Sequence, residues 1–212
     1  MIGLITLLCV IISPPIVNAQ AKSRFGIKGG INLSQLYIND SDLDDENMKV
    51  GFHAGVYAIA PLSEAFFIQP ELIFSSAGTK ATYKGSSLLG IQAGEVRFNL
   101  NYIQLPILFS GNLGPVSLQA GPYASYLINA NVSDVKNDGT VASSRELNTE
   151  DFNKLDYGIA LGAALNINVF QMGLRYNYGL REVGKSDFGR RMTKDSKNAV
   201  AQIFVGVAFG SK

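Results

Sequence analysis

The single histidine, His53, is the side chain best suited to proton-transfer chemistry in this sequence. An imidazole beside a serine or a carboxylate can act as a general base, and serines are plentiful along the chain. However, neither a Gly-x-Ser-x-Gly turn nor a pair of spaced carboxylates accompanies His53. We therefore expect a histidine held by hydrogen bonds, and we predict no catalytic and no cofactor-binding residue. The alternative is a lipid-modifying enzyme that uses His53.

An acidic run at 40–46, Asp-Ser-Asp-Leu-Asp-Asp-Glu, could bind a cation. Its alternating carboxylates resemble the first half of a calcium loop, which has Gly at the sixth position and Glu at the twelfth. Here those positions hold Asp45 and Gly51, which excludes an EF-hand. We expect a solvated acidic loop and predict no metal site, with a loose divalent-cation site as the alternative.

Five ionisable residues stand within segments that otherwise hold apolar or small side chains. Buried charges must pair, because an unpaired one costs several kcal/mol. We therefore predict a polar network centred on Glu71, with Arg97 or Arg175 as its partner, that closes the interior of the fold. A narrow ion path is the alternative. The predicted members are Lys28, Glu71, Arg97, Asp156 and Arg175.

The elements that must position these residues are strands, because apolar residues recur with a period of two. In 170–181 the even positions are apolar or tyrosine, whereas the odd positions hold Gln, Gly, Arg and Asn. The same alternation predicts eight strands, at about 23–36, 48–60, 65–78, 95–110, 115–130, 152–166, 168–182 and 198–210. In the fourth segment the apolar face changes phase, which predicts a β-bulge near Gln104 and Pro106.

The connections between these strands alternate between short turns and long polar loops, the latter at about 37–49, 78–95, 130–152 and 182–198. An even number of strands with this alternation is the layout of an outer-membrane barrel. We predict an all-β protein: an eight-stranded antiparallel up-and-down transmembrane β-barrel.

The residues that alternate with the apolar ones form a second face on each strand. The composition of this second face favours a lipid-facing barrel over a soluble, lipocalin-like ligand carrier. A face in water needs abundant charged residues, whereas this one is rich in glycine with few charges. Small residues suit the narrow lumen of eight strands, and the apolar face suits lipid. Charged residues make up only 17% of the chain, and the net charge of +1 argues against a nucleic-acid partner.

The first residues form a separate unit. An apolar run at 2–12, two prolines and the small residues of Val17-Asn18-Ala19 predict a signal peptide at 1–19, cleaved after Ala19. The run is too short to span a bilayer, although an N-terminal anchor is the alternative. The barrel domain would then occupy 20–212 and contain no cysteine.

The order of several short motifs resembles the PorT-like outer-membrane β-barrel family of Bacteroidetes-type bacteria. These motifs are Phe25–Ser34, Gly51–Val56, Ile68–Leu72, Leu100–Leu108, Gly121–Tyr123 and Asp156–Gly158. The resemblance implies a small bacterial outer-membrane barrel of structural or interaction type, and most such proteins have no assigned activity. The family's namesake is linked to secretion of proteases to the cell surface, so assistance to surface secretion or envelope integrity is an expectation here. The alternation of short turns and long loops predicts four extracellular loops. The resemblance also implies outer-membrane lipids, the barrel-assembly machinery and an unidentified envelope protein as partners. One departure is that Phe209 is followed by Gly-Ser-Lys, where such barrels usually end on an aromatic residue.

Overall fold

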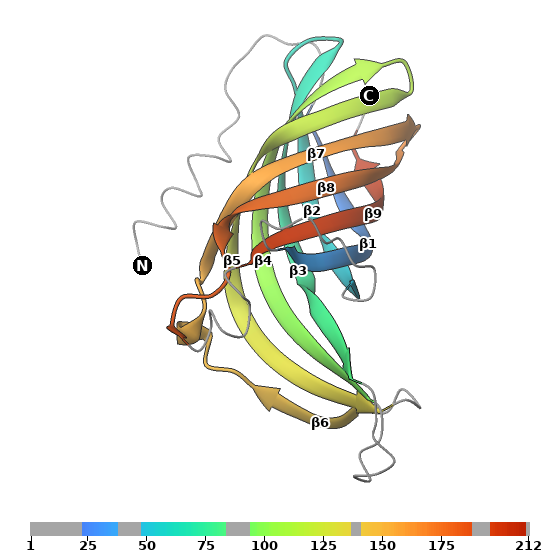
Figure 1. Ribbon diagram of the computed structural model, residues 1–212. Coiled ribbons are helices and arrows are strands. Elements are labelled where there is room, and N and C mark those ends of the chain that lie inside the picture. Colours follow the sequence, from blue (N-terminus) through green and yellow to red (C-terminus); the bar gives the residue numbers. More distant parts are fainter. Residues whose placement is uncertain (1–22, 38–47, 84–93, 137–140, 188–195, 211–212) are drawn as a thin grey trace, which may run out of the picture.

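A computed structural model describes residues 23–37, 48–83, 94–136, 141–187 and 196–210. Within these ranges eight long strands form a closed antiparallel barrel, and a short ninth strand lies outside the closure (Figure 1). The barrel strands are β1 (Arg24–Tyr37), β2 (Lys49–Pro61), β3 (Phe66–Tyr83), β4 (Gly94–Leu113), β5 (Val116–Lys136), β7 (Leu155–Ile167), β8 (Phe170–Glu182) and β9 (Lys197–Phe209). The predicted barrel fold is confirmed.

Each barrel strand pairs with the barrel strands before and after it, β5 with β7 among them, and β1 pairs with β9 to close the barrel. The pairs Phe25–Phe209 and Tyr37–Lys197 mark the two ends of that seam. Tight turns join β4 to β5 and β7 to β8, where Gly114 and Asn168 adopt positive φ angles of 66° and 56°. Gly and Asn tolerate this left-handed conformation, which explains their use in these turns.

Two of the predicted long loops are shorter than expected. The ladders of β3 with β4 and of β4 with β5 continue to Tyr83 and Lys136, and β6 (Val141–Glu146) pairs with the end of β5. In Figure 1 these strands project well beyond the rest of the barrel. Polar residues on both faces suggested loops, but a ladder beyond the hydrocarbon can have water on both faces. The predicted signal peptide and the acidic run at 40–46 lie outside the described residues.

The predicted bulge in β4 was placed on the wrong strand. The register of β3 with β4 runs without a shift, and the inward side chains of β4 stay at even positions from Phe98 to Ser110. The irregularity lies in β5, where Asn101 faces Asn129 but Tyr102 faces Leu127, so that Ile128 is the extra residue. The phase seemed to change because Phe98 and Leu100 fill the barrel interior, whereas Leu105 and Ile107 face outward.

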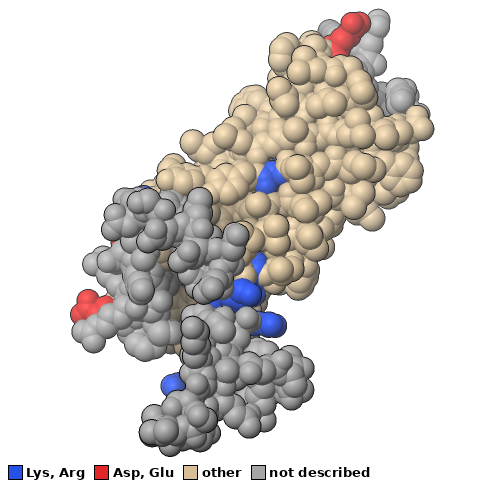
Figure 2. Space-filling model, turned by 45° about the vertical axis from the view of Figure 1, so that its right-hand side comes forward, with Lys and Arg blue, Asp and Glu red and all other residues tan. Residues whose placement is uncertain are grey.

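The outward face of the barrel is apolar over the height of a bilayer. On β8 the exposed side chains run from Phe170 to Leu180. At a rise of about 3.3 Å per residue and a tilt of about 40°, this stretch spans about 25 Å along the barrel axis, the height of an outer-membrane apolar band. Figure 2 shows one face of the barrel almost free of charged side chains.

Exposed aromatic side chains gather near both ends of this apolar surface, as interfacial girdles do. Those near the short turns are Phe25, Phe66, Phe109, Phe170 and Phe209, and those towards the other end include Tyr126, Tyr157, Tyr176 and Tyr178. The described residues include no helix that is long and apolar enough to cross a membrane.

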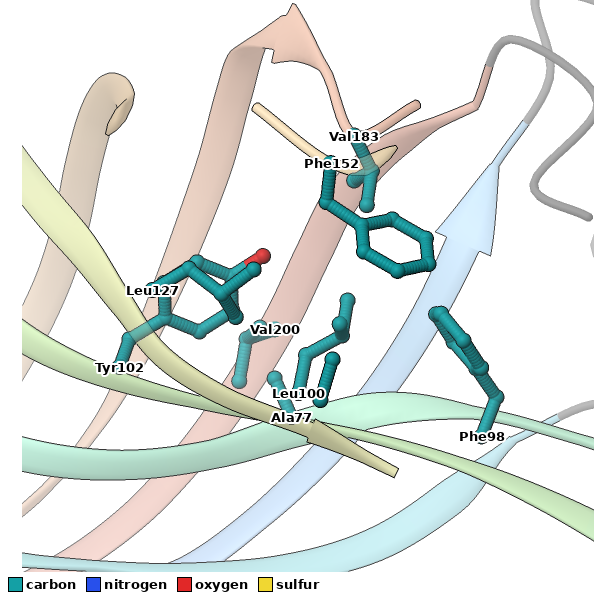
Figure 3. Packing of buried hydrophobic residues seen from close by; sticks show 9 residues of the cluster. Ala77, Phe98, Leu100, Tyr102, Leu127, Phe152, Val183 and Val200 are labelled. Atoms are coloured by element: carbon teal, nitrogen blue, oxygen red, sulfur yellow. The ribbon is translucent and has the colours of Figure 1, made fainter. Parts of the chain in front are cut away.

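Inside the barrel, apolar clusters lie on both sides of a polar layer. Near the short turns the cluster consists of Tyr57, Ile59, Phe67 and Ala208. Towards the long connections a larger cluster includes Phe98, Leu100, Tyr102, Leu127 and Phe152 (Figure 3). Phe152 follows the 3-10 helix η2 (Thr149–Asp151) and is 1% exposed, with its ring centroid 5.4 Å from that of Phe98. This residue places the connection between β6 and β7 over the interior.

Candidate functional site

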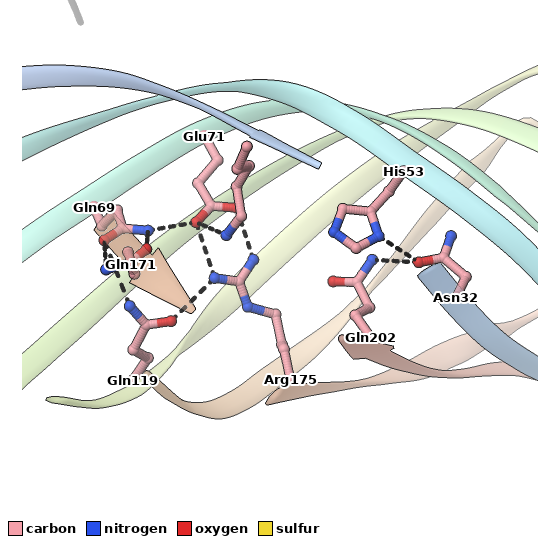
Figure 4. Close-up of polar contacts among 9 residues, drawn as sticks. Asn32, His53, Gln69, Glu71, Gln119, Gln171, Arg175 and Gln202 are labelled. Atoms are coloured by element: carbon pink, nitrogen blue, oxygen red, sulfur yellow. Dashed lines mark hydrogen bonds and ion pairs between the residues drawn. The ribbon is translucent and has the colours of Figure 1, made fainter. Parts of the chain in front are cut away.

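Glu71 lies at the centre of the polar layer, between two cations from other strands (Figure 4). Strand alternation turns Lys28 of β1, Glu71 of β3 and Arg175 of β8 towards the lumen, and all three are buried. The Lys28 Nζ atom lies 3.0 Å from Glu71 Oε1. Arg175 binds the same carboxylate through two atoms, with Nη1 at 2.7 Å from Oε2 and Nη2 at 2.9 Å from Oε1. Such bidentate pairs fix geometry as well as charge.

Three glutamines surround this ion cluster. Gln69 donates to Glu71 at 2.7 Å, and Arg175 donates to Gln119 at 3.1 Å. Gln119 and Gln171 each donate to the Gln69 side-chain oxygen at 3.4 Å. Sequence reasoning missed these residues because it searched for formal charges. Their position on the inward face of each strand is the sequence feature that could have identified them as members of the network.

The aromatic ring of Phe204 packs against both cations. Lys28 Nζ lies 3.8 Å from the ring centroid, and the guanidinium carbon of Arg175 lies 5.3 Å from it. Gly173 leaves room for the ring, because a Cβ there would lie 2.8 Å from Phe204 Cζ. The cation–π contact favours charged Lys28 and Arg175 where water is excluded.

His53 lies in a separate group with Asn32 and Gln202. The Asn32 Oδ1 atom lies 2.8 Å from His53 Nδ1 and accepts from Gln202 at 3.0 Å. His53 is 2% exposed, and among the described residues its Nε2 has no hydrogen-bond partner. The imidazole is thus held by an amide, and within the described ranges it makes no hydrogen bond to a serine or a carboxylate.

The other two predicted network members do not join Glu71. Asp156 is buried in β7, where it accepts from Asn198 at 3.1 Å and from Tyr123 at 3.4 Å. The assignment of Arg97 to the lumen was wrong: its side chain is exposed, because odd positions of β4 face outward. The structure therefore brings together Lys28, Glu71 and Arg175 only.

The arrangement of these side chains as a whole is suited to blocking the lumen. The charged cluster and its glutamines connect β1, β3, β5 and β8 across the interior. Among the described histidines, aspartates and glutamates no group of three could hold a metal ion. The interior around Glu71 is filled by these side chains, as expected for a barrel of eight strands.

Comparison with known proteins identifies the family of this chain. Residues 18–184 match the family described as outer membrane protein beta-barrel domain. No curated protein matches the chain.

Several solved structures are similar to this chain at low identity. Ail, the attachment invasion locus protein of Yersinia pestis, shares 18% identity over 89% of this chain and 100% of that chain, with a TM-score of 0.44. Neisserial surface protein A (NspA) shares 15% over 89% and 100%, with a TM-score of 0.47. OprG from Pseudomonas aeruginosa shares 14% over 89% and 97%, with a TM-score of 0.40.

Proposed function

The chain belongs to the outer membrane protein beta-barrel family, and from this premise we propose that it is a non-conducting barrel that acts through structure and interaction. Its place is the bacterial outer membrane. The proposed role is to hold a stable barrel in the bilayer and to present the projecting ends of its strands, with their connections, outside. In such barrels the longer connections face the cell exterior.

The observation that carries the proposal is the ion cluster of Lys28, Glu71 and Arg175. It joins three strands across the lumen, and apolar clusters lie on either side of it. Moving a solute through would require breaking a buried bidentate ion pair, which costs several kcal/mol. A lumen filled in this way also has no room for the ligand of a soluble carrier.

The sheet formed by the ends of β3, β4, β5 and β6 supports an interaction role. It projects beyond the other strands, and Ser143 to Glu146 of β6 are exposed. We infer that an envelope partner binds at this end, and that surface secretion or envelope integrity is the process served. Outer-membrane lipids would contact the apolar outer face, and the barrel-assembly machinery would insert the chain.

We also infer that the protein is not an enzyme. His53 is buried, and its Nδ1 is engaged by Asn32. General-base chemistry requires a histidine within reach of a substrate proton. An assay of the purified protein in lipid vesicles tests this inference, because no lipid-modifying activity should be found. An activity that His53→Gln abolishes while the barrel stays folded would contradict it.

Single-channel recording in planar bilayers tests the proposal. The purified barrel should show no steady conductance steps. The matched variant, with Lys28, Glu71 and Arg175 all changed to Ala, removes the cluster without leaving an unpaired charge, and it should conduct more than the wild type. Steady, large steps from the folded wild-type protein would contradict a closed lumen.

Export by a signal peptide cleaved after Ala19 is a further part of the proposal. The sequence features of 1–19 support it. N-terminal sequencing of the protein from outer-membrane fractions should find Gln20 first. The closer kinship with the PorT-like branch rests on the order of the strand motifs, and loss of surface protease secretion on deletion would support it.

A further inference from the structure

Three basic side chains line one groove where β7 begins and β8 ends. The groove has a volume of about 530 Å³, within the range of sites that bind small molecules. Phe152, Asn153 and Leu155 form part of its wall. The charged residues that line it are Glu150, Lys154, Arg181 and Lys185. A groove of this size has room for a polar headgroup and is too large for a single ion.

The two chain segments that carry these cations are fixed to each other by hydrogen bonds. The side chain of Asn153 donates to the backbone oxygens of Glu182 and Gly184, at 2.8 and 3.2 Å. The backbone N–H of Lys185 donates to the backbone oxygen of Asp151 at 2.9 Å. The backbone on both sides of the groove is therefore positioned before a ligand binds, which lowers the entropic cost of binding.

Arg181 is held in place by neutral oxygen atoms, which leaves its charge available to a ligand. Its Nη1 donates to the backbone oxygen of Leu155 at 2.9 Å, and its Nη2 donates to Asn153 Oδ1 at 3.0 Å. These two residues flank Lys154, so the guanidinium lies beside the backbone of Lys154. Asp156 attracts Arg181 but does not line the groove. None of the three cations forms an ion pair with a carboxylate in the described part of the chain.

The charge of the groove matches that of a phosphate monoester. Lys154, Arg181 and Lys185 contribute +3 and Glu150 contributes −1, which gives +2. A phosphate monoester carries about −1.5 to −2 at neutral pH and has three strong acceptor oxygens. Arginine binds such a group through two atoms, which adds geometric specificity to the attraction between the charges.

The groove also borders the apolar outer face of the barrel. Leu155 lines the groove and is 47% exposed, in phase with the outward side chains of Tyr157 and Ile159 on β7. On β8, Arg181 directly follows Leu180, which ends the exposed apolar stretch of that strand. The cations therefore lie where the hydrocarbon of a bilayer ends and the lipid headgroups begin. A ligand that matches both surfaces is phosphorylated at one end and apolar at the other.

We propose that this groove binds the phosphate monoester headgroup of a lipid in the outer leaflet. Lys154, Arg181 and Lys185 bind the phosphate oxygens, and the acyl chains lie along the outward faces of β7 and β8 from Leu155 onward. This site deepens the proposed contact with outer-membrane lipids, and it rests on the proposed place of this end of the barrel at the cell exterior. It does not depend on the lumen being closed.

Amide NMR of the isotope-labelled barrel in uncharged dodecylmaltoside micelles tests the proposal. Titration with dihexanoyl phosphatidic acid at neutral pH should give saturable shifts at the amides of 153–155 and 181–186. Dihexanoyl phosphatidylglycerol has a phosphate diester with one charge fewer, and it should bind about fivefold more weakly. Glycerol 3-phosphate has the same monoester without acyl chains, and it should bind about tenfold more weakly or worse, because it buries no methylene groups.

Lys185→Gln is the variant that keeps this test decisive, because Lys185 is exposed and the variant should fold. It should weaken binding of phosphatidic acid about fivefold, the effect of one cation at a charged lipid surface. Arg181→Gln should weaken binding about tenfold or more, because it also removes the two-atom contact. Lys197→Gln is the matched control, since Lys197 begins β9 and does not line the groove, and it should bind as the wild type does.

Absence of saturable shifts at these amides would overturn the proposal. Equal affinity for glycerol 3-phosphate would also overturn it, because the site would then bind a soluble phosphate, and so would equal affinity for phosphatidylglycerol. Unchanged binding in Lys185→Gln and Arg181→Gln, or an equal loss in Lys197→Gln, would show that charge alone collects phosphate around the rim, against the proposal. Conductance by a barrel that still binds phosphatidic acid would refute the closed lumen and leave this site standing.

Discussion

Replacing Glu71 with Gln should destabilise the barrel more than any other single change in its ion cluster. The variant keeps the size of the side chain and removes the one carboxylate that, among the described residues, contacts Lys28 and Arg175. In the wild type the three charges sum to +1. Glu71→Gln raises the sum to +2, whereas Arg175→Gln lowers it to 0 and leaves the Lys28–Glu71 pair intact.

The expected magnitude follows from these contacts. Glu71 accepts hydrogen bonds from Lys28, from Gln69 and twice from Arg175, at 2.7 to 3.0 Å. Removing one partner of a buried ion pair costs about 3–5 kcal/mol, because the other charge stays buried. We expect about that loss for Glu71→Gln and about 1–3 kcal/mol for Arg175→Gln, since the latter leaves polar groups but no uncompensated charge.

Urea unfolding in lipid vesicles, followed by tyrosine fluorescence and by heat-modifiable mobility on gels, measures these losses. With a slope of about 2–3 kcal/mol per M, Glu71→Gln should lower the midpoint by about 1–2.5 M. The double variant Glu71→Gln/Arg175→Gln should recover part of the stability, because it removes one stranded cation. A loss smaller for Glu71→Gln than for Arg175→Gln, or no recovery in the double variant, would refute charge compensation as the reason for the cluster.

Two further perturbations test other parts of the structure. Leu174→Arg, near the middle of the outward face of β8, should cost about 2–4 kcal/mol in bilayers, whereas Ile167→Arg at the short turn should cost about 0–1 kcal/mol; equal costs in the same unfolding assay would contradict the assigned membrane depth. Phe152→Ala should cost about 3–5 kcal/mol, because Phe152 is buried against Phe98 and leaves a cavity. A loss below about 1 kcal/mol would show that Phe152 does not hold the connection onto the barrel.

The eight barrel strands, and the facing of all of them except the first half of β4, could be predicted from the sequence because both depend on local alternation. The outward residues of β8 follow a strict period of two, and that period is set by the pleat of each strand. Glycine on the second face also identified the lumen correctly, since Gly173 lies against Phe204. These features need no knowledge of which strands meet across the barrel.

The membership of the ion cluster could be predicted only in part because it depends on contacts across the lumen. Alternation places Arg175 inward, but nothing local shows that it meets Glu71 from the other side of the barrel. Arg97 looked equivalent because the apolar neighbours Phe98 and Leu100 suggested a lipid face, whereas they pack in the interior. The bulge at Ile128 was assigned to the wrong strand for the same reason.

The extent of β3, β4 and β5 was underestimated because hydrophobic patterning ends where the bilayer ends. Beyond that point Thr79 and Asn131 continue the ladder with polar side chains. These strand ends are held by backbone hydrogen bonds between strands. Such bonds require no alternation of apolar and polar side chains, so the sequence pattern does not show them.

The assignment of the two barrel faces is the central claim, and the adjacent residues Ile203 and Phe204 of β9 test it most directly. They lie at the same depth, with side chains 46% and 1% exposed. The chain contains no tryptophan, so the fluorescence of a single Trp introduced at either position is measured without a signal from other tryptophans. In bilayers of lipids brominated near the centre, Ile203→Trp should be strongly quenched and Phe204→Trp should not. Strong quenching at 204 with none at 203 would contradict the account, because the lumen and lipid faces would then be exchanged.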